Sequence, residues 1–257
     1  MRDVLVLCYH AVSERWPAYL SVAPEAFEAQ IAHLLRRGYR ATTFSSAVAE
    51  RPRGRTLVVT FDDGFQSVHD LAFPILQRLG VPATLFVPTA YMGRDEPMTW
   101  PGIDEWVGTE FEHELAGMSW DGVREVRDAG WEIGSHTHSH PKLTEVGDAE
   151  LRAELETSRA LCEERLGEPC RSIAYPYGDV DARVVAAAGR AGYAAAATLP
   201  ELAERERPLS WPRLGVYRYE SLDRFKRHCS WSLRRLQRSP AWPGAISLWR
   251  RVNPEAR

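Results

Sequence analysis

Two short stretches of the sequence carry side chains that could do chemistry. The first is Leu57–Gly64, an apolar, β-branched run that ends in Asp62, Asp63 and Gly64. Such a run predicts a buried strand, and α/β folds place their chemistry at strand ends. Adjacent strand residues point to opposite faces, so a bend permitted by Gly64 is needed to bring both carboxylates into one pocket. An exposed Asp-Gly turn is the alternative interpretation.

The second stretch, Trp131–Pro141, holds three histidines at alternate positions, His136, His138 and His140. His136 and His140 are four residues apart, so one turn of chain can direct both imidazoles at one ion. Neutral imidazoles with one carboxylate and an open water position form a ligand set for catalytic zinc. A solvated, His-rich loop is the alternative. Together with the aspartate pair, this spacing predicts a divalent metal site, which we expect to hold Zn²⁺.

These stretches and a third one resemble motifs of the polysaccharide deacetylases, the NodB-homology or carbohydrate esterase 4 group. The three motifs occur in the family's order: Thr60–Gly64, Ser135–His140 and Tyr175–Gly178. The resemblance covers residues 1–216 and implies a distorted (β/α) barrel with its active site at the C-terminal strand ends. It implies a metal-dependent hydrolase that removes N-acetyl groups from an amino sugar in a polysaccharide or glycolipid.

The resemblance also implies roles for individual residues. Asp62 matches the general base, and the metal ligands are matched by Asp63, His136 and His140. In the third motif, the backbone N–H of Tyr177 would face the developing oxyanion, with Tyr175 and Pro176 beside the substrate. A Pro-x-Gly turn that closes a strand is equally compatible with these residues.

The third motif departs from the family pattern. The family has an arginine two residues before the proline, where this sequence has Ala174. We expect Arg213, in Trp211-Pro212-Arg213, to supply an arginine that orients the base. Trp211 could line the pocket for the acyl methyl group. Both residues also fit an ordinary place at the rim of the core.

The family's C-terminal Leu-x-His motif has no match after residue 216, where His228 lies in a charged helical context. Instead, Tyr9-His10 ends the first strand. This dipeptide resembles the Tyr-His of the poly-N-acetylglucosamine deacetylase subgroup, whose motif order is circularly permuted. The resemblance makes His10 the general acid that protonates the leaving amine. A structural histidine at a strand end is the alternative.

The elements that must position these residues alternate between strand and helix, which favours parallel pairing in an α/β fold. We expect strands at 4–8, 57–61, 83–87, 131–134, 171–175 and 193–198. We expect helices at 24–37, 68–79, 120–129, 148–166 and 181–191, and a short one after residue 45. Residues 91–118 interrupt the rhythm as an insertion loop, either a lid on the substrate side or plain surface. Residues 1–216 are expected to form one domain.

Composition sets further bounds. The 257 residues are 44% hydrophobic and 26% charged, as in ordinary globular proteins. The N-terminus lacks the pattern of a signal peptide and no apolar run is long enough to span a membrane, so we expect a cytoplasmic protein. Without an export signal, the four cysteines are expected to be reduced thiols.

Charge is distributed unevenly. The formal net charge is −3, yet residues 205–257 carry 13 Lys and Arg against 4 Asp and Glu. We expect 217–257 to be a basic, amphipathic extension packed on or flanking the domain. Its basic residues have two interpretations: a face exposed to solvent, or a contact with an anionic membrane. We expect no nucleic-acid partner. Two other functions remain open: hydrolysis of a non-sugar C–N bond on the same fold, and carbohydrate binding without catalysis.

Overall fold

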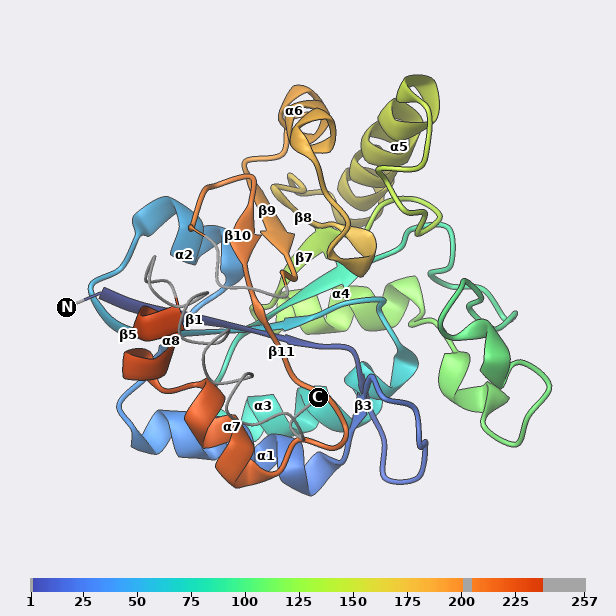
Figure 1. Cartoon of the computed structure of the whole chain (residues 1–257). Helices are drawn as coiled ribbons and strands as arrows, with labels where there is room; N and C mark the ends of the chain where they lie inside the picture. Colours follow the sequence, from blue (N-terminus) through green and yellow to red (C-terminus); the bar gives the residue numbers. More distant parts are fainter. Residues whose placement is uncertain (1, 201–204, 238–257) are drawn as a thin grey trace, which may run out of the picture.

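The computed structural model describes residues 2–200 and 205–237, and it alternates strands with helices along most of the chain (Figure 1). The strands are β1 (Arg2–Tyr9), β2 (Ala11–Val12), β3 (Ser21–Val22), β4 (Arg40–Ala41), β5 (Gly54–Phe61), β6 (Ala83–Val87), β7 (Glu132–Ser135), β8 (Ser172–Ala174), β9 (Ala195–Thr198), β10 (Trp211–Pro212) and β11 (Leu214–Gly215). The α-helices are α1 (Pro24–Arg36), α2 (Phe44–Glu50), α3 (Phe73–Leu79), α4 (Trp120–Asp128), α5 (Asp148–Leu166), α6 (Ala182–Arg190), α7 (Leu222–His228) and α8 (Trp231–Gln237).

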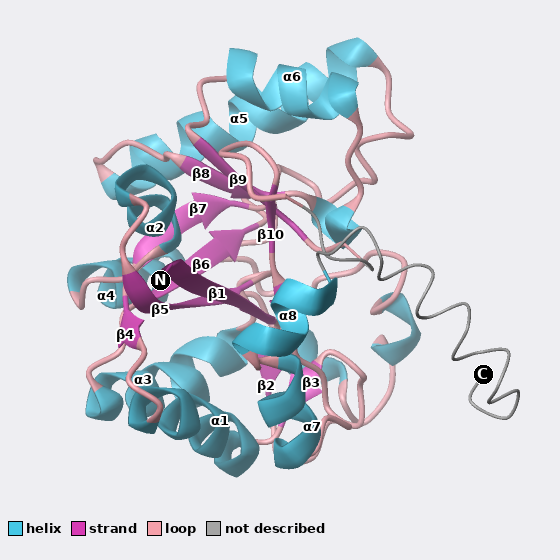
Figure 2. Cartoon of the chain, turned by 60° about the vertical axis from the view of Figure 1, so that its left-hand side comes forward, coloured by secondary structure: helices cyan, strands magenta, loops and turns pink. Residues whose placement is uncertain are grey.

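Nine strands form one parallel sheet in the order β10-β9-β8-β7-β6-β5-β1-β11, with β4 paired to β5. The two edge strands, β10 and β11, are separated in sequence only by Arg213, so one short stretch joins both edges of the sheet. The sheet therefore curls into a nearly closed barrel surrounded by helices (Figure 2). This arrangement confirms the predicted (β/α) barrel.

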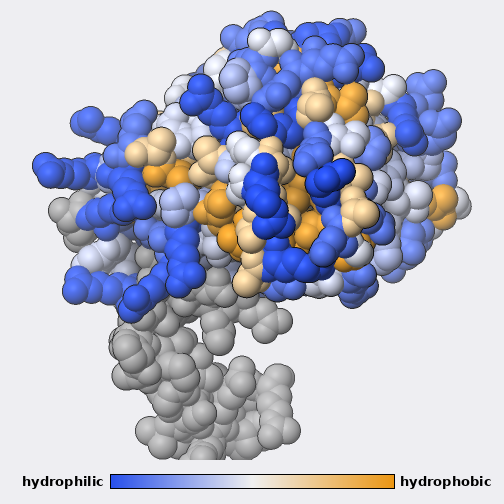
Figure 3. All heavy atoms as spheres, turned by 90° about the horizontal axis from the view of Figure 1, so that it is seen from above, coloured by the Kyte–Doolittle hydropathy of each residue, from blue (hydrophilic) through white to orange (hydrophobic). Residues whose placement is uncertain are grey.

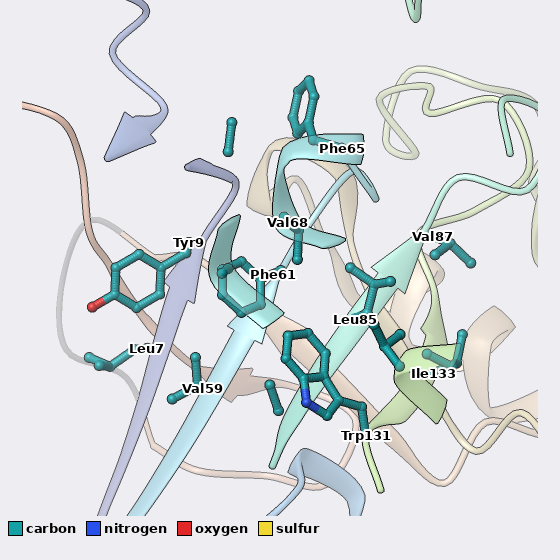
Figure 4. Close-up of a cluster of buried hydrophobic side chains, with 14 of the residues drawn as sticks. Leu7, Tyr9, Val59, Phe61, Phe65, Val68, Leu85, Val87, Trp131 and Ile133 are labelled. Carbon is teal, nitrogen blue, oxygen red and sulfur yellow. The ribbon is translucent and has the colours of Figure 1, made fainter. Parts of the chain in front are cut away.

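Alternation along the strands divides the core into two layers. Leu7, Tyr9, Val59 and Phe61 project outward from β1 and β5 and pack beneath the helices (Figure 4). Residues of the opposite parity fill the barrel with a second cluster: Val4, Val6, Val58, Phe86, Ala174, Ala195, Ala197 and Trp211. Helix α2 adds Phe44, Ala47 and Val48 to this cluster near the start of β1 and β5. The same alternation directs Cys8, Thr60 and Asp62 toward the interior at the C-terminal ends of the strands.

One predicted helix differs in the structure, and five short strands were not predicted. The expected helix at 68–79 begins as a π-helical turn, Val68–Ala72, and becomes α-helical only from Phe73. Pro74 explains the change, because proline has no N–H for the regular helical hydrogen bond. The sequence also gave no signal for the two-residue strands β2, β3, β4, β10 and β11, since a strand that short shows no alternation.

The outer surface over α5 and α6 is mainly hydrophilic, with small hydrophobic patches between the charged residues (Figure 3). In the described part of the C-terminal extension, Phe225 of α7 is buried, and Arg234 of α8 donates to the buried Asp3 carboxylate at 2.5 Å. Residues 238–257 lie outside the described part, and the membrane contact stays a prediction. Within the described residues, the longest helices are too short or too polar to cross a membrane.

Candidate active site

The two adjacent aspartates reach one pocket through a left-handed bend. Asp62 continues the inward alternation of β5, and its N–H donates to the carbonyl of Tyr9 at 3.0 Å. Asp63 would point outward on an extended chain, but it adopts φ +70° and Gly64 follows with φ +65°. The bend therefore begins at Asp63 itself, one residue earlier than the glycine suggested. Aspartate tolerates this backbone region better than most residues do, which allows both carboxylates to converge.

Asp62 forms a bidentate ion pair with Arg213. The guanidinium donates to Oδ1 at 2.6 Å and to Oδ2 at 2.7 Å, and it also donates to Thr60 Oγ1 at 2.9 Å. Burial alone would raise the pKa of Asp62, but the positive charge of Arg213 and the nearby His136 lower it to about 2. The fork geometry fixes the carboxylate plane as well as its charge.

Asp63, His136 and His140 form a buried three-residue cluster. Asp63 Oδ1 lies 3.3 Å from Nε2 of each histidine, yet it makes no hydrogen bond of good geometry. His136 Nδ1 lies 2.8 Å from the carbonyl of Ala174, so that nitrogen carries the proton and Nε2 presents a lone pair to the cluster. An orphaned carboxylate oxygen facing two imidazole nitrogens fits a divalent cation with nitrogen and oxygen ligands.

The loop that carries the histidines has a strained backbone. Thr137 and His140 adopt φ +67° and +64°, a region that non-glycine residues rarely occupy. Glu154 on α5 holds this loop: its carboxylate accepts from the N–H groups of His138 and Ser139 at 2.8 Å and from Ser139 Oγ at 2.6 Å. The sequence reasoning missed Glu154, although its polar side chain falls on the buried stripe of α5.

Removing this support is expected to loosen the metal site. Glu154→Ala should weaken divalent-metal affinity by about 10–100-fold, the usual effect of losing a group that orients ligands. Glu154→Gln keeps one acceptor oxygen and should lose less. Competition with a chromogenic chelator measures the affinity. Glu156→Ala, on the exposed side of the same helix, is the matched control and should bind metal normally. Equal affinities for Glu154→Ala and wild type would contradict the role of Glu154.

A second polar cluster, Cys8, His10 and Asp62, borders the first. Their potential ligand atoms lie within 4.8 Å of one another. Burial raises the pKa of the Cys8 thiol well above its usual value, so the thiol stays protonated and donates to Asp62 Oδ2 at 3.4 Å. Because both Asp62 oxygens already face the Arg213 guanidinium, a second cation here would be repelled. The cluster suits proton handling better than metal binding, and Cys8 is a member that the sequence reasoning missed.

Aromatic rings enclose the cluster of Asp63, His136 and His140 on the side of His140. Trp100 stacks on the His140 imidazole at 4.2 Å, and Tyr177 meets it edge-on at 4.7 Å. Trp100 belongs to the predicted insertion loop 91–118, so this loop contributes a wall of the site. Tyr177 is 40% exposed and adopts φ +60°, which turns its ring toward His140.

The structure does not bring every predicted residue to the site. Tyr175 is fully buried and donates its O–H to the carbonyl of Leu209 at 3.0 Å. Trp211 is also buried, and it packs within the barrel beneath the Arg2 guanidinium. Pro176 is buried as well. His138, the histidine between the two expected ligands, was not expected at the metal, and its Nδ1 lies 3.0 Å from Thr89 Oγ1. Sequence patterns do not reveal which way each side chain points, so the burial of Tyr175, Pro176 and Trp211 could not be predicted from them.

Comparisons with known proteins match this chain to one family. The family model described as polysaccharide deacetylase matches residues 49–196. The poly-beta-1,6-N-acetyl-D-glucosamine N-deacetylase of Staphylococcus aureus (strain MSSA476) is 27% identical over 171 residues, or 62% of this chain and 54% of that protein. The chain spans between half and two thirds of the curated relatives that it matches first.

Two solved structures extend the likeness to the fold. A polysaccharide deacetylase from Bacillus cereus superposes with a TM-score of 0.73 and 26% identity, covering 89% of this chain and 69% of the other. IcaB from Ammonifex degensii gives a TM-score of 0.71 and 25% identity, covering 91% and 98%. The fold around the site is therefore shared with solved proteins over most of the described chain.

Proposed function

The chain belongs to the polysaccharide deacetylase family, and we propose that it is a metal-dependent hydrolase that removes N-acetyl groups from an amino sugar in a polysaccharide or glycolipid. The observation that supports this most is that two adjacent, buried carboxylates have different partners. Asp63 faces two imidazoles as a metal ligand, while Asp62 is held apart by Arg213. Metal-assisted hydrolysis of an amide needs both a ligand and a free base.

Asp63, His136 and His140 would hold the divalent cation, and the imidazole nitrogens favour Zn²⁺. When bound, such an ion lowers the pKa of water from 15.7 to about 7 and polarises a carbonyl oxygen. Asp62, with its pKa lowered to about 2, is a weak base. It can accept a proton only from a water that is itself unusually acidic, so its function depends on a neighbouring metal.

In the proposed reaction, Asp62 takes the proton of the water as its oxygen bonds to the acetyl carbon. Arg213 keeps the carboxylate oriented, and the Cys8 thiol adds a weaker hydrogen bond to Oδ2. The backbone N–H of Tyr177 would then stabilise negative charge on the carbonyl oxygen. Asp62 becomes a carboxylic acid in this addition step, while Arg213, Cys8 and the Tyr177 N–H act through hydrogen bonds alone.

His10 would complete the reaction by donating a proton to the sugar nitrogen as the C–N bond breaks. An amine is a poor leaving group unless it is protonated, and imidazole is suited to that transfer near neutral pH. His10 directly follows β1 and lies beside Asp62, with its Nδ1 buried and without a hydrogen-bond partner. The products are acetate and the free amino sugar.

Acetate release tests the proposed function. The metal-loaded protein, incubated with oligomers of N-acetylglucosamine, should yield acetate and free amines in equal amounts, measured by an enzyme-coupled acetate assay and an amine-reactive dye. Turnover confined to small non-sugar amides would instead identify an amidohydrolase. Binding of the oligomers without acetate release, by a protein that retains its metal, would identify a carbohydrate-binding protein.

The metal ligands provide a direct test of the site. Asp63→Ala, His136→Ala and His140→Ala should each lose bound metal and nearly all activity while the barrel remains folded, because each removes one of three protein ligands. Metal content by mass spectrometry and circular dichroism give the two readouts. His138→Ala is the matched control, since its ring bonds to Thr89, and it should keep the metal. Full metal content in all three ligand variants would contradict the assignment.

A further inference from the structure

A row of aromatic rings leads from His10 to the protein surface. The Tyr217 ring lies 6.5 Å from the His10 imidazole at an interplanar angle of 24°, and Tyr19 stacks on Tyr217 at 4.2 Å and 18°. Tyr19 is 61% exposed, so the outer end of the row faces solvent. We call Tyr217 and Tyr19 the aromatic platform.

The inner end of the platform adjoins the reaction centre. Tyr217 lies over the backbone of β11, where a Cβ on Gly215 would come within 2.6 Å of the Tyr217 hydroxyl oxygen. Gly215 pairs with Cys8 on β1, which donates to Asp62. Burial is the main cause that raises the pKa of Tyr217, and the nearby Cys8 raises it further. A glycine at 215 therefore allows the phenol to lie beside the residues proposed for proton transfer.

The outer end is held rigidly although it is exposed. Trp16, on the loop between β2 and β3, is fully buried against Phe65 at 5.7 Å and so anchors the loop that carries Tyr19. The backbone N–H of Arg218 donates to the Tyr19 carbonyl at 3.0 Å, which ties this loop to the segment after β11. An aromatic face held in place before a ligand arrives costs little entropy on binding.

The chemistry of the platform favours a neutral, ring-shaped ligand. Arg218, which follows Tyr217 in the chain, directs its guanidinium to Ser21 Oγ at 2.9 Å and to the carbonyls of Ser13 and Glu14. Its charge is thus taken up within the loop, and the platform offers a flat apolar face with polar hydroxyl tips. Such a surface suits a ligand with one apolar face and a polar rim, which describes a pyranose ring.

We propose that Tyr19 and Tyr217 form a sugar-binding subsite, in which Tyr19 stacks on a pyranose ring further along the glycan chain from the one that is deacetylated. This subsite rests on the proposed function, because its position relative to His10 gives it meaning only on a glycan chain. The enzyme would then prefer oligomers over the single amino sugar, since only a chain reaches both the metal cluster and the platform.

Tyr19→Ala and Tyr19→Phe test the subsite. We compare kcat/KM for the pentamer of N-acetylglucosamine with kcat/KM for the monomer. The wild type should favour the pentamer, and Tyr19→Ala should lower that ratio by about 2- to 12-fold, the range expected for one aromatic stack. Tyr19→Phe keeps the ring and should keep the ratio. An unchanged ratio in Tyr19→Ala, or a wild type with no preference for length, overturns the subsite.

A binding measurement separates this proposal from the proposed function. Calorimetry with the pentamer should show weaker binding to Tyr19→Ala than to wild type and Tyr19→Phe. Tyr19-dependent binding without any acetate release would retain the subsite and reject the deacetylase. Acetate release without Tyr19 dependence would do the reverse. A smaller molecular mass in solution for Tyr19→Ala would show that the platform joins copies of the chain, which also overturns the subsite.

Discussion

Asp62→Asn is expected to keep the metal but lower kcat by about 10²–10⁴-fold, the usual contribution of a general base. Asparagine has the size of aspartate but cannot accept the proton of the attacking water. The ligands Asp63, His136 and His140 are untouched, so metal content should match that of the wild type. Steady-state kinetics on an N-acetylglucosamine oligomer, together with metal analysis, provide the measurement.

The control must account for the buried charge that this substitution leaves behind. Arg213 would lose its counter-ion, and breaking a buried ion pair costs about 3–5 kcal/mol of stability. Asp3→Asn offers a matched case, because Asp3 is buried and pairs with Arg234 at the other end of β1. Both variants should unfold more easily, but only Asp62→Asn should lose rate. Near-normal kcat in folded Asp62→Asn would limit Asp62 to a structural role.

His10→Ala is expected to retain metal and substrate binding while kcat on the amide falls by about 10²–10⁴-fold. The physical reason lies in the leaving group, because an amine needs a proton before the C–N bond breaks. An activated aryl acetate has a leaving group that departs without one. The loss on that ester should therefore be much smaller than the loss on the N-acetyl sugar.

Two comparisons make this result specific to His10. His228→Ala should behave as wild type, since His228 lies on α7 and pairs with Glu220 at 2.5 Å. His10→Gln restores some polarity without an acid near neutral pH, and it should be as slow as His10→Ala on the amide. Equal losses on amide and ester would assign His10 a role in positioning and leave the proton donor to another group.

Local sequence features were enough to predict that Asp63, His136 and His140 lie together. Asp63, His136 and His140 follow strand patterns that the structure also contains, and their motifs are short enough to recognise within one stretch of sequence. The barrel was equally predictable, because alternating strands and helices leave few arrangements other than parallel pairing. The helix Asp148–Leu166 has the bounds that its sequence pattern suggested.

Contacts between residues that are far apart in the sequence could not be predicted. Cys8 meets Asp62 across 54 residues, and Glu154 reaches a loop on another element through backbone N–H groups that carry no sequence signal. The burial of Tyr175 and Trp211 could not be predicted for a related reason. A residue next to a motif can face the pocket or the core, and only the closed barrel decides between them.

The place where the edge strands β10 and β11 meet has a consequence for how the protein folds. Arg213 sits between the two edge strands and contacts Asp62 across 151 residues of sequence. Contacts of such long separation carry a high loop-closure cost and slow the search for the native topology. Insertion of β10 and β11 both completes the sheet and delivers the guanidinium to the aspartate. A nascent chain thus carries the three proposed metal ligands before Arg213 can orient Asp62. The Arg213–Asp62 ion pair forms only when the two edge strands join the sheet.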